Sequence, residues 1–226
     1  MPQAQKRRGL SQETLKIIAC GTMLLDHIGA CLFPRQLWLR VIGRIAFPIY
    51  CFLLVEGVYH TKRPLQYLFR LTIGMILSEY FFDAALFGGW TWQHQSVIVT
   101  LVLAYIMVRF MLLIPPLWGK LLIILPFALA AELLNTDYGA LGIALVAMFV
   151  LTRRMRHRSA IQAFCICLLS VFYQGVPTLE PLAVMALLPI DFYSGRKAAN
   201  SRVIQWTFYL FYPVHLAILL LVQNLL

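Results

Sequence analysis

Long apolar runs recur along the chain, and short polar segments separate them. A helix needs about 20 apolar residues to cross the hydrocarbon core of a bilayer. By this measure we predict nine membrane-spanning helices, at 15–33, 41–59, 66–87, 96–114, 119–135, 138–152, 160–174, 179–190 and 204–225. The eighth run is short and lies among Pro177, Pro181 and Pro189, so a tilted or re-entrant segment is the alternative there.

Composition excludes the soluble alternatives. Of the 226 residues, 61% are hydrophobic and 12% are charged, and the mean hydropathy is +0.79. Soluble domains contain about 45–50% apolar and about 25% charged residues. A soluble globule of this size could not cover so much apolar surface, and the same composition excludes a secreted disulfide scaffold and a disordered chain. We therefore predict an all-α polytopic membrane protein with about nine transmembrane helices.

The basic residues orient these helices. A net charge of +10 would favour nucleic-acid binding in a soluble chain, but here Lys and Arg concentrate in short loops on one side, as the positive-inside rule describes. With the N-terminus in the cytosol, the outer loops hold Arg35 and Arg40. The inner loops then hold Lys6, Arg7, Arg8, Lys62, Arg63, Lys120, Arg153, Arg154, Arg156, Arg158, Arg196, Lys197 and Arg202. We predict a cytosolic N-terminus and an outer C-terminus, with a basic segment at 1–14 and one transmembrane domain at 15–226.

Several ionisable side chains fall inside the predicted spans, where each is costly and therefore marks a candidate site. Depth follows from the helical rise of about 1.5 Å per residue. Lys16 and Glu56 lie at the inner face, and His27 shares a helix face with Lys16 about 16 Å deeper. The group that we place in the middle and outer half, with Arg44 nearby, is Asp26, His27, Glu79, Asp83, Glu132 and His215.

Structural roles compete with function for most of these residues. Arg44 paired with an acidic residue of the third span, Asp83 or Glu79, would fix helix packing. Glu132 would cap a helix end and turn, and His215 would hydrogen-bond the carbonyl that the preceding proline frees. An unperturbed histidine titrates near neutral pH, and His27 shares a face with an interfacial cation, so we interpret it as functional.

A buried histidine near carboxylates serves as a general base or as part of a proton relay. Phosphate-binding glycine loops, the nucleophile elbow and the zinc-protease motif do not occur in the sequence. Basic inner loops beside a buried base suit an anionic cytosolic donor whose reactive end enters the membrane. Residue chemistry alone leaves two functions open, an enzyme of this kind and a proton-coupled transporter or flippase.

Five motifs occur in order along the chain. The first, at 15–29, is a Lys-x10-His helix with an adjacent Asp-His pair, and the others lie at 43–48, 54–57, 135–139 and 211–216. This ordered set, which covers residues 15–220, resembles the TraX family of integral membrane proteins. The first helix is similar, more distantly, to the Lys/Arg-x10-His helix of the transmembrane acyltransferase superfamily.

The resemblance implies an acetyltransferase, because founding members of the family acetylate the N-terminus of conjugative pilin. The donor would be cytosolic acetyl-CoA, and the acceptor an amine or hydroxyl of a peptide or glycan-like molecule at the membrane or its outer face. His27 would be the catalytic histidine. Other motif positions are matched by Lys16, Asp26, Arg44, Tyr212 and His215.

Each candidate can be given a role in such a reaction. Cations at the inner face would attract the coenzyme A phosphates, so the expected donor site comprises Lys16, Glu56, Lys62, Arg63, Arg70 and the basic loop at 153–158. Asp26 lies about 100° around the helix from His27, so we expect Glu79 or Glu132 to orient the imidazole. Oxyanion stabilisation would come from Arg44, Tyr212 or His215. We expect no bound metal, and an oligomer stays open.

Overall fold

The structure is a computed structural model that describes residues 9–174, 179–196 and 202–225, so residues 1–8 of the expected basic segment lie outside it. Its named elements are all helical. They are α1 (Gln12–Cys31), α2 (Leu37–Gly43), α3 (Ala46–His60), α4 (Pro64–Phe87), α5 (Val97–Leu113), α6 (Leu117–Leu133), α7 (Gly139–Thr152), α8 (Arg158–Gln174), the 3-10 helix η1 (Glu180–Ala186), α9 (Leu187–Asp191) and α10 (Arg202–Leu225). Each predicted span coincides with one of these, except that α2 with α3 forms the second and η1 with α9 forms the eighth.

The second span is broken at Arg44 and Ile45, between α2 and α3. Pro48 explains the break, because it has no N–H to donate to the carbonyl of Arg44 four residues earlier. The interruption changes the helix direction without a long loop. It leaves Arg44 at the end of α2, where its side chain faces α1.

The polarity of the described surface is that of a membrane protein. Large apolar side chains face outward, as in Leu65 and Leu133, which are 79% and 73% exposed, whereas Asp83 is fully buried. Soluble monomers rarely expose large contiguous apolar surfaces. Three helical stretches in the described chain are long and apolar enough to cross a bilayer on their own, Gln12–Cys31, Leu37–His60 and Gln205–Leu225, and shorter apolar helices accompany them. The chain is therefore an all-helical membrane protein, although not every helix is long and apolar.

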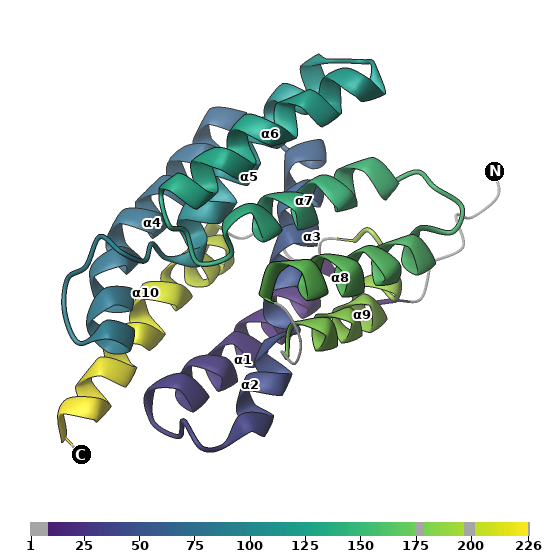
Figure 1. The fold of residues 1–226 in the computed structure, drawn as a ribbon. Helices are drawn as coiled ribbons and strands as arrows, with labels where there is room; N and C mark the ends of the chain where they lie inside the picture. The colour runs from purple at the N-terminus through teal and green to yellow at the C-terminus, as the bar shows by residue number, and fades with distance from the viewer. Residues whose placement is uncertain (1–8, 175–178, 197–201, 226) are drawn as a thin grey trace.

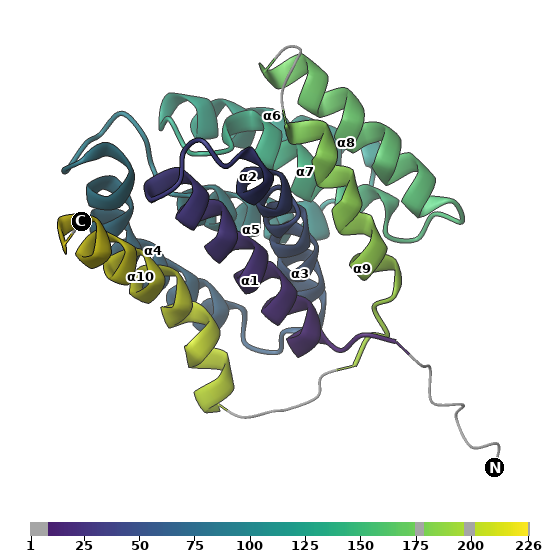
Figure 2. The same cartoon turned by 90° about the horizontal axis from the view of Figure 1, so that it is seen from below.

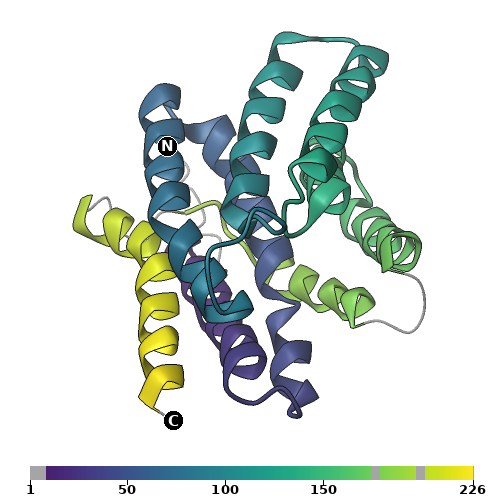
Figure 3. The same cartoon turned by 60° about the vertical axis from the view of Figure 1, so that its left-hand side comes forward.

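The helices form a bundle around α3, which packs against α1, α5, α7 and η1 (Figure 1). Helix α6 lies at the periphery, packed on α5 and α7, with Gly119 and Ala131 as its buried residues (Figure 3). Helix α8 packs on η1 and α9 at the other side of the bundle. Helix α10 packs on α4 and α1 (Figure 2).

Helices α1 and α10 run parallel. Contacts join Lys16 to the Phe208 ring, His27 to His215, and the Cys31 carbonyl to Gln223. We call the end of the bundle where α1 begins, with the loops at 60–64 and 153–158, the inner end, and the opposite end, with the loops at 32–36, 88–96 and 134–138, the outer end. The chain enters α1 at the inner end and leaves α10 at the outer end, and the membrane side that each faces stays a prediction.

Candidate functional site

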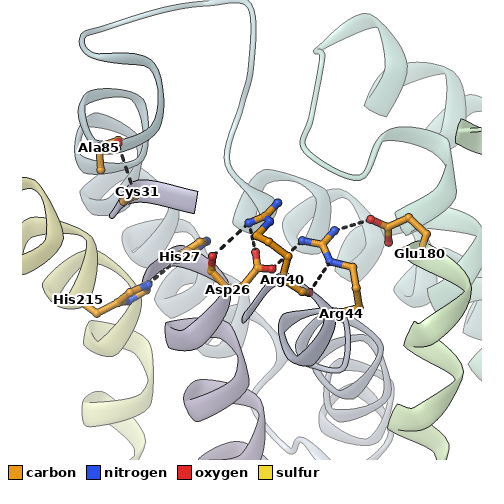
Figure 4. A network of polar contacts seen from close by, with 8 residues as sticks. All are labelled: Asp26, His27, Cys31, Arg40, Arg44, Ala85, Glu180 and His215. Atoms are coloured by element: carbon orange, nitrogen blue, oxygen red, sulfur yellow. Dashed lines mark hydrogen bonds and ion pairs between the residues drawn. The ribbon is translucent and has the colours of Figure 1, made fainter. Parts of the chain in front are cut away.

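His27 and His215 form a buried pair near the outer end. His27 lies four residues before the last residue of α1, and its Nδ1 is 2.6 Å from Nε2 of His215 on α10 (Figure 4). The two ring planes lie within 4° of parallel, and the side chains are 9% and 5% exposed. The expectation that these histidines converge is confirmed in its geometry, and the contact between them is direct.

The hydrogen bonds of the pair assign its neutral tautomers. His215 Nδ1 is 2.7 Å from the carbonyl oxygen of Phe211, which can only accept, so this nitrogen carries the proton. His215 Nε2 is then an acceptor, and His27 Nδ1 must donate to it. A neutral imidazole has one N–H, so Nε2 of His27 carries the lone pair. The chain of contacts therefore leaves a basic nitrogen on His27.

The carbonyl that His215 binds differs from the one that we expected. Pro213 removes the donor for the carbonyl of Tyr209, four residues earlier, whereas His215 binds the carbonyl of Phe211. The bond is a local link along α10 that fixes the His215 ring. Phe211 also stacks on that ring, with centroids 4.9 Å apart.

Tyr212 lies beside the histidines with an unused hydroxyl. Its ring meets His27 edge-on, with centroids 5.7 Å apart and planes at 78°. The side chain is 5% exposed, and among the residues that the structure describes its buried Oη has no hydrogen-bond partner. An unpartnered buried hydroxyl is costly, so this donor is available to a molecule that binds next to His27.

An ion network occupies the other side of α1 (Figure 4). Asp26 accepts from two arginines, through Oδ2 from Arg40 at 2.6 Å and through Oδ1 from Arg44 at 2.8 Å. Arg44 also pairs with Glu180 at the start of η1. Each carboxylate of the network thus contacts an arginine, as buried charges require, and Asp137 also interacts electrostatically with both arginines. The close approach of α2 depends on Gly43, since a Cβ there would overlap the side chain of Asp26.

The network agrees with one expectation and corrects another. Asp26 does point away from His27, as the 100° offset along α1 predicted. The structural partner that we expected for Arg44, Asp83 or Glu79, is replaced by Asp26 and Glu180. The expected candidates omitted Glu180, which begins the least regular span, and treated Arg40 as a loop residue. The spacing of Arg40 and Arg44, four residues apart on one helix face, was the available signal.

The carboxylates expected to orient His27 serve helix and loop backbones instead. Glu79 accepts from the backbone N of Ser96 at 2.9 Å and from its hydroxyl at 2.7 Å, just before α5. Glu132 accepts from the N of Ala140 at 2.7 Å, in the first turn of α7. Carboxylates at helix N-termini satisfy free N–H groups and favour the helix dipole. The orienting role expected for Glu79 or Glu132 is therefore corrected, because His215 is the partner of His27.

The motif at 135–139 is a loop that closes the same end. Gln95 pairs with its backbone, donating to the Asn135 carbonyl and accepting from the Asp137 N–H, both at 2.9 Å. Tyr138 stacks on Phe47 of the motif at 43–48, with centroids 3.6 Å apart. The motifs at 43–48, 135–139 and 211–216 thus meet the His27 end of the first motif toward the outer end. Lys16, at the start of the first motif, and the motif at 54–57 lie toward the inner end.

The residues expected to bind the donor occupy separate places. Lys16 Nζ lies 5.0 Å from the Phe208 ring centroid, and Arg70 lies 5.7 Å from that of Tyr209, so both contact the inner half of α10. Lys62 and Arg63 are exposed in the loop between α3 and α4.

Glu56 forms an ion pair with Arg153 at 2.9 Å. With Gln12, His60 and Tyr193 it lines a pocket of about 270 Å³ at the inner end. The described residues contain no cluster of three or more His, Cys, Asp or Glu side chains able to hold a metal ion.

The fold is polytopic and helical, and it holds a histidine pair and an ion network at one end. This chain is therefore a membrane protein with a buried polar site. The sequence profile of the TraX protein family matches residues 11–223, and the chain belongs to that family.

Several relatives match over most of their length. The probable fimbrial assembly protein FimC, serogroup H1, of Dichelobacter nodosus is 30% identical over 226 residues, which cover 91% of this chain and 92% of the relative. Protein TraX of Escherichia coli is 26% identical over 223 residues, which cover 92% of this chain and 85% of the relative. No solved structure matches the chain.

Proposed function

We propose that this protein is a membrane acetyltransferase that uses acetyl-CoA as donor and Nε2 of His27 as general base. The observation that carries the proposal is the hydrogen-bond chain from His27 through His215 to the Phe211 carbonyl, which leaves the lone pair on that nitrogen. The acetyl transfer implied by the family resemblance supplies the reaction. The proposed location is the bacterial cytoplasmic membrane, with the acceptor approaching from the outer end.

The reaction balances with His27 as the only proton carrier. Nε2 takes the proton of the acceptor amine or hydroxyl while the acceptor atom attacks the thioester carbonyl carbon. The new C–N or C–O bond forms, the C–S bond breaks, and the coenzyme A thiolate takes the proton from Nε2. The products are the acetylated acceptor and coenzyme A with a free thiol.

His215 would stabilise the intermediate state. When His27 becomes an imidazolium, its Nδ1–H donates a charge-assisted hydrogen bond to His215 Nε2, and such bonds are about twice as strong as neutral ones. Tyr212 is the best-supported oxyanion donor, because its hydroxyl is buried beside His27 and no group in the described part of the chain bonds to it. Arg44 already binds two carboxylates, so we give it the role of positioning α1.

The donor would approach the inner end. Lys16, Lys62, Arg63 and Arg70 supply positive charge there, and a basic surface attracts the phosphates of coenzyme A. Glu56 is committed to Arg153, so we assign it to holding α3 against α7 near this surface.

Ligand binding to the purified protein tests the proposal first. Acetyl-CoA and coenzyme A should raise the thermal midpoint, since a ligand at a hundredfold excess over its Kd stabilises by about 2.7 kcal/mol. GTP, an anionic nucleotide without a pantetheine arm, is the control and should not. Acetyl transfer from labelled acetyl-CoA to an amine acceptor is the second measurement. Absence of both effects, together with proton flux into vesicles that hold the protein, would favour the transporter instead.

A further inference from the structure

An apolar groove leads along the surface of the bundle to the histidine pair. It lies between α1 and α10, encloses about 300 Å³, and is lined by Ile17, Cys20, Gly21, Leu24, Thr207, Phe208 and Phe211. The two helices run side by side in Figure 2. Ile17 on α1 and Leu210, Val214 and Ile218 on α10 are exposed apolar side chains, so we place the groove against the hydrocarbon of the membrane.

The groove ends about one helical turn from the site. On α1 its lining residues follow helical spacing up to Leu24, and the next turn carries His27. On α10 it ends at Phe211, whose ring stacks on His215. A chain in the groove would therefore end beside the histidine pair, at the outer end of the bundle.

The size of the groove fits a single hydrocarbon chain. From Ile17 to Leu24 it extends about 10 Å along the helix axis, and it is a narrow groove that is open along one side. A transmembrane helix is about 10–12 Å wide with its side chains, which is too wide for a narrow groove. One extended acyl chain matches the groove and a helix does not.

The chemistry of the lining argues against the pantetheine arm of the donor. The arm carries amides and a hydroxyl, which lose their hydrogen bonds to water when they are buried without partners. Apart from Thr207, the one lining side chain with a polar atom is Cys20, whose Sγ is 3.1 Å from the Tyr50 hydroxyl. A chain of methylene groups loses nothing on such a surface.

We propose that this groove holds the acyl chain of a lipid-anchored acceptor from the outer leaflet and places its headgroup amine or hydroxyl at Nε2 of His27. The proposal rests on the acetyl transfer proposed above and names the class of acceptor. The headgroup atom forms the bond to the acetyl carbon, its proton goes to His27, and coenzyme A leaves as the thiol. The acyl chain is in an apolar environment both in the bilayer and in the groove, so its transfer gains little hydrophobic free energy. The groove therefore acts by aligning the headgroup with His27.

Gly21 provides a test that spares the fold. A Cβ at this position meets no atom within 4 Å, so Gly21→Phe adds a ring to the groove without a backbone clash. Replacing a glycine inside a helix also favours the helical conformation. Leu129→Phe on α6 is the matched control, because Leu129 is 60% exposed and lies outside the groove.

Acetyl transfer is measured with two pairs of acceptors that differ in the acyl chain. Lysophosphatidylethanolamine is compared with glycerophosphoethanolamine, and lysophosphatidylglycerol with glycerophosphoglycerol. The native protein should prefer the chain-bearing member of at least one pair. Gly21→Phe should lower kcat/KM for that lipid by about 10- to 100-fold, the effect of misplacing a reactant. Its KM for acetyl-CoA and its rate with the chainless acceptor should not change, and Leu129→Phe should behave as the native protein.

Three results of this assay would overturn the proposal. They are equal use of the chainless acceptors by the native protein, unchanged lipid acetylation in Gly21→Phe, and a raised KM for acetyl-CoA in that variant. The last would assign the groove to the donor.

Photo-crosslinking separates failure of the groove from failure of the proposed enzyme. The protein is placed in nanodiscs of phosphatidylcholine and phosphatidylethanolamine, and the phosphatidylethanolamine carries a diazirine in one acyl chain. The nanodiscs are irradiated, and the labelled peptides are identified. Labelling of the groove residues in the native protein and in Leu129→Phe, but not in Gly21→Phe, is the expected result and needs no acetyl transfer. Absence of label in the groove overturns the lipid site even if acetyl transfer is found with soluble acceptors.

Discussion

Removal of His215 tests whether the two histidines act as one unit. His215→Ala leaves the Nδ1–H of His27 without the acceptor that lies 2.6 Å away. A hydrogen bond to a charged group contributes about 1.5–3 kcal/mol, so losing it from the imidazolium should lower kcat about 10- to 150-fold. His27→Gln removes the base itself and should cost about 10²–10⁴-fold. His215→Gln should recover much of the loss, because an amide oxygen can accept from Nδ1 while the amide nitrogen donates to the Phe211 carbonyl.

The assay is turnover of labelled acetyl-CoA by purified variants, each checked for monodispersity and for stabilisation by coenzyme A. The double variant His27→Gln/His215→Ala should be no slower than His27→Gln alone, since residues that act together are not additive. Full activity in His215→Ala, with a stable fold, would refute the stabilisation of the His27 imidazolium by His215. Near-normal turnover in His27→Gln would refute the assignment of the base.

Three further predictions concern packing, the donor and topology. Gly43→Ala should destabilise the protein by about 1–3 kcal/mol, because the added methyl overlaps the carboxylate of Asp26 on α1. Thermal unfolding measures this, with Gly21→Ala as the control that should not destabilise. Equal thermal midpoints for the two variants would contradict the close packing of α2 on α1. Replacing Lys62 and Arg63 with Gln should weaken coenzyme A binding and leave turnover at saturating donor unchanged, since such contacts bind ground and transition states alike; lower turnover with unchanged affinity would assign them to catalysis. A reporter at the C-terminus should be active outside and one beside Arg156 inside, and finding both on one side would exclude the nine-span topology.

The hydrophobic pattern was sufficient to predict where the helices lie, because a helix that crosses the hydrocarbon core needs a continuous apolar run of about 20 residues. Depth along a helix was sufficient to bring His27 and His215 to the same level, since the rise per residue is constant. The break before α3 could be anticipated from Pro48, which removes one backbone donor. These features depend on local geometry, which one helix determines by itself.

The partners of the acidic residues could not be predicted in the same way. Glu79 and Glu132 lie at the expected level but face helix N-termini, and the rotation of one helix against the next is set by packing. Glu180 lies in a segment interrupted by prolines, where periodicity gives no direction. The sequence shows that a buried carboxylate needs a hydrogen-bond donor, but it does not show which one. Backbone N–H groups serve this purpose as well as a histidine does.

The adjacent Asp26 and His27 show how α1 is held from two sides. Successive residues on a helix differ by about 100° in direction, so Asp26 reaches α2 and the arginines while His27 reaches α10. The offset that prevents Asp26 from orienting His27 therefore lets one turn of α1 be fixed between two neighbouring elements. Because each carboxylate of the ion network contacts an arginine, the network can anchor α1 on the side opposite the histidine pair. A base that must meet its acceptor within a few tenths of an ångström depends on such anchoring, and this ties the ion network to the proposed chemistry without assigning its residues a proton-transfer step.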